Sequence, residues 1–106
     1  MIVSVLSVPD YDSAQSIAKI LIEEKYAYEI HLPSPVKTYL SGADGKMEIR
    51  EEYLILMKSR AVEFSKLEQR VKQLTDKKPF NLVSMPVTQM SKEYFEWTQI
   101  FPLLKN

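Results

Sequence analysis

Cysteine is absent from the chain, glycine occurs twice and histidine once. Without cysteine there is no disulfide, no thiolate metal ligand and no cysteine nucleophile. Two glycines are too few for a glycine-rich phosphate-binding loop. The single histidine, His31, has no nucleophile-elbow motif beside it that would complete a catalytic triad. These absences exclude the commonest catalytic arrangements, and we expect a protein that is not an enzyme.

An excess of charge of either sign is also missing. Lys and Arg number 14, as do Asp and Glu, so the formal net charge is zero. No positive field attracts nucleic acid or an anionic membrane, and no apolar run approaches the length of a membrane span. The apolar residues 2–8 lack a basic segment before them, which favours a strand over a signal peptide. We therefore expect a soluble cytoplasmic protein without nucleic acid or membrane partners.

The first half of the chain alternates strand and helix patterns. Residues 2–8 are almost continuously apolar, as in a buried central strand. Helical spacing of apolar residues follows, with Asp10 or Asp12 as the expected cap. Residues 27–40 are extended, with a bulge or an edge position expected at Pro33 and Pro35. A turn at 42–45 leads to a strand over 46–58 that is half-exposed at its beginning and buried toward its end.

The second half predicts a helix, a short strand and a last helix. Apolar residues from Phe64 to Leu74 repeat at helical spacing, and residues 80–85 form a strand that Pro86 stops. Ser91 is the expected cap of a helix with Tyr94, Trp97 and Phe101 on one stripe, which Pro102 limits. The order βαββαβ plus a helix predicts one α+β domain over 1–106, a ferredoxin-like sandwich.

The predicted hairpin of 27–40 and 46–58 is unusually long for a small domain. Its edges would be left unpaired in water, which is hazardous unless another chain covers them. The hairpin therefore predicts an oligomer.

A ferredoxin-like fold hosts many functions, so a site must decide between them. The loop after the first strand, Pro9-Asp10-Tyr11-Asp12, is acidic and would repel a phosphate. The first strand has no aromatic residue for stacking RNA bases. Neither an acylphosphatase-type site nor an RNA-binding sheet is expected.

The chain resembles the CutA divalent-cation-tolerance family along most of its length. The motifs that carry the resemblance are Ser7-Val8-Pro9-Asp10, Glu23-Glu24-Lys25, Glu51-Glu52-Tyr53-Leu54-Ile55-Leu56-Met57-Lys58-Ser59, Leu82-Val83-Ser84-Met85-Pro86-Val87 and Tyr94-Phe95-Glu96-Trp97. The resemblance implies the same fold, a homotrimer and a role in tolerance of divalent metal ions such as copper.

Three departures from the family pattern concern residues usually discussed for metal or ligand binding. Glu29 stands at the family's cysteine position, and residues 75–82 lack the His and Tyr of the family's HPYEVPEI run. The tryptophan expected after Tyr39 is missing. The fold and the trimer are therefore better supported by the resemblance than the metal role.

Six residues are candidates for a site. His31 and Glu29, two apart on one strand face, are candidate ligands of a divalent metal ion, which one chain could hold only weakly. Alternatively, His31 is structural or solvent-facing and Glu29 is a solvated edge charge. Tyr39, Lys58, Tyr94 and Trp97 are candidates for a ligand-binding cleft between subunits. A structural role is the alternative for these residues as well. Lys58 can mark the place where its strand leaves the core, and Tyr94 and Trp97 can be packing anchors.

Two functional hypotheses follow from different classes. The first is a non-enzymatic, CutA-like homotrimer with a role in divalent metal-ion tolerance or homeostasis. The second is a signalling module of the PII type, which shares the fold and the trimer and would bind a small ligand between subunits.

Overall fold

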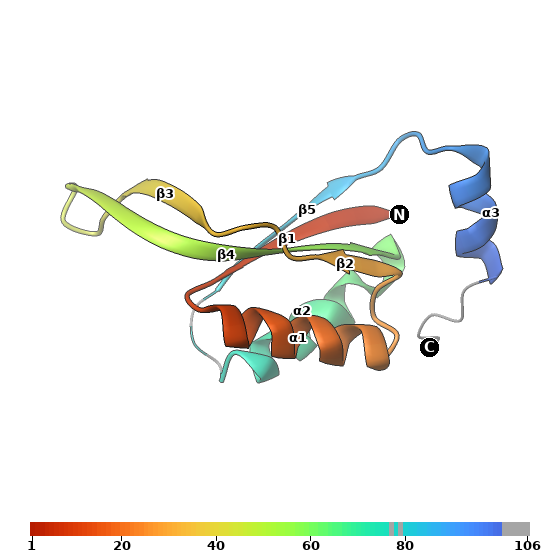
Figure 1. Cartoon of the computed structure of the whole chain (residues 1–106), viewed down its shortest axis with the longest axis horizontal. Helices are drawn as coiled ribbons and strands as arrows, with labels where there is room; N and C mark the ends of the chain where they lie inside the picture. The colour runs from red at the N-terminus through yellow and green to blue at the C-terminus, as the bar shows by residue number, and fades with distance from the viewer. Residues whose placement is uncertain (77, 79, 101–106) are drawn as a thin grey trace.

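A computed structural model describes residues 1–76, 78 and 80–100 of the chain. The strands are β1 (Ile2–Val8), β2 (Glu29–His31), β3 (Val36–Ser41), β4 (Met47–Ser59) and β5 (Asn81–Pro86). The helices are α1 (Tyr11–Glu23), the short 3₁₀ helix η1 (Ala61–Glu63), α2 (Phe64–Leu74) and α3 (Lys92–Ile100). Figure 1 shows α1 and α2 together on one face of the sheet and α3 at one end of it. The predicted ferredoxin-like α+β fold with an additional C-terminal helix is confirmed.

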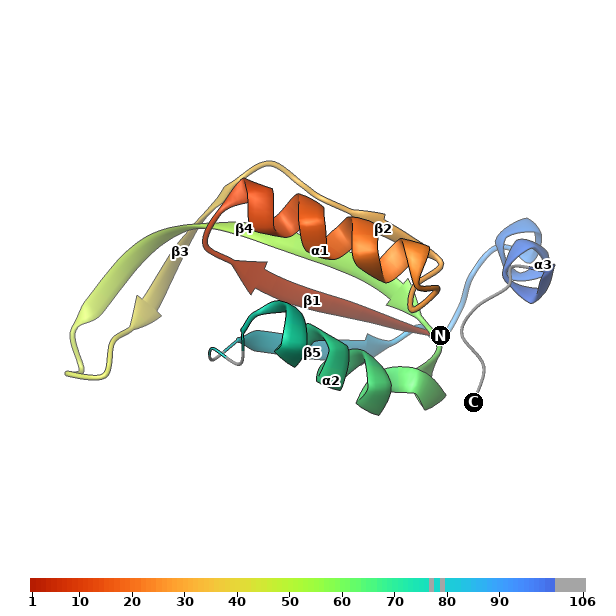
Figure 2. The same cartoon turned by 90° about the horizontal axis from the view of Figure 1, so that it is seen from below.

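All strand pairs of the sheet are antiparallel, and the spatial order is β2-β4-β1-β5. β1 is therefore central, as predicted. Its pairing with β4 ends where Val8 lies opposite Tyr53, so residues 47–52 of β4 continue past the body of the sheet. There β4 pairs only with β3, from Val36 opposite Glu52 to Ser41 opposite Met47. This two-stranded ribbon projects from the molecule in both views (Figures 1 and 2).

The extended segment 27–40 forms two strands and not one. β2 and β3 both pair with β4, and they are separated by residues 32–35. Pro33 and Pro35 lie in this gap and have no backbone N–H to donate to a ladder. The prolines do interrupt the extended segment, but as a complete break in pairing and not as the expected bulge or edge position.

Local signals place the helix starts and the ribbon turn. The Asp10 carboxylate accepts the backbone N–H of Ser13 at 2.8 Å, so Asp10 and not Asp12 caps α1. The Ser91 hydroxyl accepts the backbone N–H of Tyr94 at 3.2 Å, as predicted for the start of α3. The turn at 42–45 is also confirmed, with Gly45 at a φ of 80° that favours glycine.

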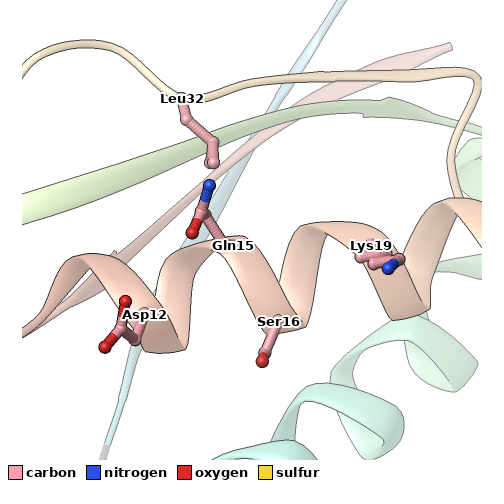
Figure 3. A pocket seen from close by; sticks show the side chains of 5 residues that line it. All are labelled: Asp12, Gln15, Ser16, Lys19 and Leu32. Atoms are coloured by element: carbon pink, nitrogen blue, oxygen red, sulfur yellow. The ribbon is translucent and has the colours of Figure 1, made fainter.

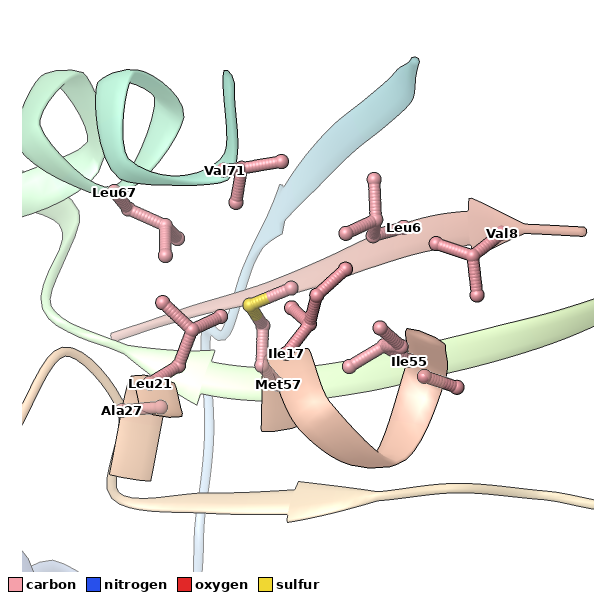
Figure 4. Close-up of a cluster of buried hydrophobic side chains, with 10 residues drawn as sticks. Leu6, Val8, Ile17, Leu21, Ala27, Ile55, Met57, Leu67 and Val71 are labelled. Carbon is pink, nitrogen blue, oxygen red and sulfur yellow. The ribbon is translucent and has the colours of Figure 1, made fainter. Parts of the chain in front are cut away.

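The core lies between the sheet and the two helices α1 and α2. Figure 4 shows its apolar side chains converging from β1, β4, α1 and α2. The fully buried ones include Leu6, Leu21, Ile55, Met57 and Val71. Burial along β1 alternates, because only the helix-facing side chains are covered. The prediction of a buried β1 therefore holds for one of its two faces within a single chain.

The face of the sheet opposite these helices is apolar and largely uncovered. Residues that pair across antiparallel strands share a face, so Val5 lies in a row with Leu56 and Val83, and Val3 in a row with Met85. Val83 is 60% exposed and Met85 is 52% exposed. We call this surface the open face and define it by Val3, Val5, Leu54, Leu56, Val83 and Met85.

β5 forms the edge of the sheet next to β1. It includes Pro86, which lies opposite Ile2, so the prediction that Pro86 stops the strand is wrong by one residue. A proline is tolerated here because β5 is an edge strand. Phe101, predicted on the stripe of the last helix, and Pro102, predicted to limit that helix, lie outside the described part of the chain. No helix among the described residues is long and apolar enough to cross a membrane.

Candidate functional site

Strand pairing brings three of the six candidate residues together at one end of the open face. Glu29 of β2 lies directly opposite Lys58 of β4, and His31 lies opposite Leu56. Lys58 in turn lies opposite Val3 of β1, which fixes all three polar side chains on the open-face side of the sheet. α3 then brings Tyr94 and Trp97 to the same place.

Glu29 is the centre of this group. Its Oε1 accepts a hydrogen bond from Lys58 Nζ at 2.7 Å and lies 3.2 Å from His31 Nε2. Side-chain exposure is about one third for Glu29 and Lys58, at 35% and 31%. Lys58 and His31 therefore meet on the same carboxylate oxygen, Lys58 partly covered and His31 more exposed, at 59%.

Aromatic rings from two segments complete the group. Lys58 Nζ lies 4.8 Å from the centroid of the Tyr94 ring, which is within the range of a cation–π contact. The Trp97 ring lies 5.5 Å from Tyr94 and 6.2 Å from Tyr28, which precedes β2. We call Tyr28, Glu29, His31, Lys58, Tyr94 and Trp97 the Lys58 cluster.

Ionisation within the Lys58 cluster favours charged Glu29 and charged Lys58. The hydrogen bond from Lys58 lowers the pKa of Glu29 below its ordinary value, and the hydrogen bond to Glu29 raises the pKa of Lys58. Burial, followed by the Glu29 charge, raises the pKa of the Tyr94 hydroxyl. The cluster thus contains a stable ion pair beside a neutral phenol.

The Tyr94 hydroxyl oxygen is buried, and no described residue forms a hydrogen bond of normal geometry with it. Glu29 and Lys58 nevertheless lie near enough to influence its ionisation. Tyr94 and Trp97 are themselves partly buried in the single chain. The packing role that the sequence left open for them is compatible with these contacts.

Tyr39 is the candidate that the structure does not bring to this place. It lies on β3 opposite Ile49, in the ribbon, and is 61% exposed. Tyr39, Met47 and Ile49 share one face of the ribbon because of the pairing register. Sequence reasoning missed Tyr28, because successive side chains of an extended segment point to opposite faces and its position just before Glu29 therefore gave no signal.

The described residues do not form a site that fits a divalent metal ion. No group of three or more His, Cys, Asp or Glu side chains capable of holding an ion occurs in residues 1–76, 78 and 80–100. His31 and Glu29 meet as expected, but they are only two donors, and a tight zinc or copper site uses three or four. Lys58 also competes for the carboxylate.

Two surface hollows elsewhere on the described part of the chain do not present convergent chemistry either. The hollow in Figure 3 lies between α1 and Leu32, and its polar side chains Asp12, Ser16 and Lys19 follow one another along the helix. A groove beside the end of β1 contains Arg50 together with carboxylates. It is lined by Ser7, Pro9, Arg50, Glu51, Glu52, Phe80 and Asn81. Arg50 is already paired with Glu48 at 2.8 Å, so this groove does not favour a phosphate ligand.

Comparison with known proteins gives a consistent result. The family model described as CutA1 divalent ion tolerance protein matches residues 2–100. The Divalent-cation tolerance protein CutA of Thermus thermophilus is 32% identical over 95 residues, covering 90% of this chain and 91% of the relative.

Solved structures agree with the sequence match. The divalent cation tolerance protein Cut A1 from Thermus thermophilus has a TM-score of 0.83 at 30% identity, covering 92% of this chain and 94% of that one. A protein of Archaeoglobus fulgidus, described as the periplasmic divalent cation tolerance protein CutA, has a TM-score of 0.83 at 25% identity, covering 93% and 96%.

Proposed function

The chain belongs to the CutA1 divalent ion tolerance family, and on that premise we propose that it acts in tolerance of divalent cations, copper among them, as a non-enzymatic homotrimer. The observation that carries the proposal is the family match over residues 2–100. The trimer is the assembly that the sequence resemblance implies. Features of the single chain support an assembly independently of that resemblance.

The open face supports a partner because its area is apolar and uncovered. Rows of Val, Leu and Met side chains from three strands face solvent in the single chain, including Val83 and Met85. Contiguous exposed apolar surface of this kind commonly marks a protein–protein contact. Burying it against another copy would give β1 the second covered face that its continuous apolar sequence predicts.

The ribbon favours an assembly in which the ribbon of one copy contacts a different surface of the next copy. Residues 47–52 of β4 pair with β3 on one edge only, and β5 has no neighbour beyond it among the described strands. Tyr39, Met47 and Ile49 add an exposed apolar face to the ribbon. A contact of the ribbon on one copy with a different surface on the next is heterologous, which is the kind that closes into rings.

Light scattering on the purified protein tests the assembly. We expect a mass near three times the 12.3 kDa of one chain, and a mass near 12.3 kDa at micromolar concentration would contradict the proposal. Met85→Lys places a charge on the open face and should dissociate the assembly.

Val62→Lys is the matched control, because Val62 is also an exposed apolar residue, at 74%, but lies in η1 outside the sheet. It should leave the mass unchanged. Equal effects of Met85→Lys and Val62→Lys would show that the open face has no special role.

The role in cation tolerance is tested in cells that lack their own CutA protein. Expression of the chain should restore growth at raised copper concentration, and Met85→Lys should restore less than Val62→Lys if assembly is required. Failure of the unaltered chain to change growth in copper, zinc or cobalt would contradict the proposed function. We also propose a cytoplasmic location, which cell fractionation tests.

A further inference from the structure

We propose that the Lys58 ammonium is the resident cation of the Glu29–His31 pair, taking the place at the carboxylate that a divalent metal ion would need. This inference concerns one site within a single chain and goes beyond the proposed function. It stands on contacts inside the chain and does not depend on assembly.

The Glu29 carboxylate is already occupied by Lys58. Lys58 Nζ donates to Glu29 Oε1 at 2.7 Å, and His31 Nε2 lies 3.2 Å from the same oxygen. A metal ion bound jointly by Glu29 Oε1 and His31 Nε2, the two atoms that face each other, would have to lie beside that oxygen. The ammonium already lies there, placed by the direct pairing of residues 29 and 58 across β2 and β4.

Lys58 is also held from a second side, by an aromatic ring. Its ammonium lies 4.8 Å from the centroid of the Tyr94 ring, and that ring lies tilted against Trp97 with 5.5 Å between the ring centroids. A carboxylate on one side and an aromatic face on the other are both attractive to a cation. The raised pKa of Lys58 and the lowered pKa of Glu29 agree with this arrangement.

The positive charge of Lys58 would also repel a metal ion at this place. A divalent ion beside Glu29 would have a fixed positive charge within a few ångströms. In water, repulsion between a unit charge and a divalent charge about 4 Å apart weakens binding about thirtyfold. Partial burial makes the effect larger, because the medium screens the charges less.

A functional consequence follows for this chain. At the Glu29–His31 pair the chain does not capture free metal ions, so any metal binding that serves divalent-cation tolerance takes place elsewhere than at this pair. The site instead fastens α3 to the end of the open face.

Titration calorimetry with Zn²⁺ tests the proposal on the full chain. The unaltered protein should give no saturable Zn²⁺ site at micromolar metal. Lys58→Met removes the charge and keeps most of the side-chain length, and its Zn²⁺ binding should saturate at a metal concentration about thirtyfold or more below the concentration that the unaltered chain requires. Adding His31→Ala to Lys58→Met should remove that gain.

Two controls separate charge from other effects. Lys58→Arg keeps a cation beside Glu29 and should not gain Zn²⁺ affinity. Lys19→Met removes an exposed lysine of α1 that is not part of the Lys58 cluster, and it should behave as the unaltered protein. Light scattering on each variant records assembly separately, so a failed trimer is not mistaken for a changed site.

Two results would overturn the proposal. One is a micromolar Zn²⁺ site in the unaltered protein that His31→Ala abolishes. The other is a folded Lys58→Met variant whose Zn²⁺ affinity is unchanged. If circular dichroism shows Lys58→Met to be unfolded, the His31 imidazole resonances of the unaltered protein decide: they should not shift with micromolar Zn²⁺, and a saturable shift would refute the idea.

Discussion

At the scale of single residues, Trp97 shows how α3 is attached. Its ring contacts Tyr28 and Tyr94, while the side chain stays partly exposed in the single chain. Phe95, on the same helix, is 51% exposed. The attachment of α3 therefore depends on particular ring contacts more than on deep burial of the helix.

Trp97→Ala should destabilise the protein by roughly 2 kcal/mol, below the range of about 3–5 kcal/mol typical of fully buried aromatic residues. The loss comes from two ring contacts and from partial burial. Urea unfolding followed by far-UV circular dichroism measures it. Phe95→Ala is the control and should cost clearly less, whereas equal losses for both variants would contradict this account of α3.

Sequence reasoning reached most of the Lys58 cluster but not its geometry. The spacing of Glu29 and His31 places them on one face of any strand, so their contact was predictable. The pairing of Glu29 with Lys58 depends on the register between β2 and β4, which no local pattern specifies. The separate position of Tyr39 likewise follows from the break after β2, which shifts Tyr39 into the ribbon.

At the scale of elements, one ion pair connects the two helices that cover the core. Arg70 of α2 donates to both carboxylate oxygens of Glu24, which follows α1, at 2.7 and 2.8 Å. The hydrogen bonds from Arg70 lower the pKa of Glu24 below its ordinary value of 4.5. A two-pronged contact of this kind fixes orientation better than a single hydrogen bond.

The pH dependence of this pair has a definite sign. Because the pKa of Glu24 is lowered in the folded state, its contribution to stability is present above about pH 4.5 and is lost as pH falls through the folded value. Glu24→Gln should therefore lower the free energy of unfolding at neutral pH, and the difference from the unaltered protein should disappear in acid.

Unfolding curves in urea between about pH 7 and about pH 3 measure that difference. Glu23→Gln, at the neighbouring exposed position, is the control and should show little difference at any pH. A Glu24→Gln effect that persists undiminished in acid would exclude the ion pair as its cause.

The sequence was enough to predict which helices and strands exist, but it was less informative about where a strand is interrupted or ends. Apolar periodicity and capping residues such as Asp10 and Ser91 identify α1 and α3 correctly, since these signals act locally. Pro33 and Pro35 indicated an interruption, but whether a strand bulges or breaks depends on the partner strand. Pro86 could join β5 because the edge of the sheet requires no N–H donor there.

At the scale of the whole molecule, stability should depend on protein concentration. If the open face is covered by other copies, association stabilises the folded chain by mass action. The melting temperature should then rise by several degrees between about 1 and about 100 µM protein. Differential scanning calorimetry at two or more concentrations measures it.

Met85→Lys should melt at a lower temperature that no longer varies with concentration, because the variant cannot associate through the open face. An unaltered protein whose melting temperature is independent of concentration across this range would contradict the assembly. The alternation of burial along β1 was hidden in the sequence, because a continuous apolar run does not say whether its second cover comes from the same chain.

The central position of β1 has a consequence for the order of folding events. Both neighbours of β1 lie far along the chain, since β4 begins at Met47 and β5 begins at Asn81. During synthesis, this apolar strand must wait for residues 53–59 before the ladder with β4 can form, and for residues 81–86 before the ladder with β5 can form. Such long-range pairing slows folding and leaves β1 available to chaperones in the meantime. We therefore expect completion of the sheet by β5, and not formation of the early helix α1, to be the step that commits the nascent chain to its native topology.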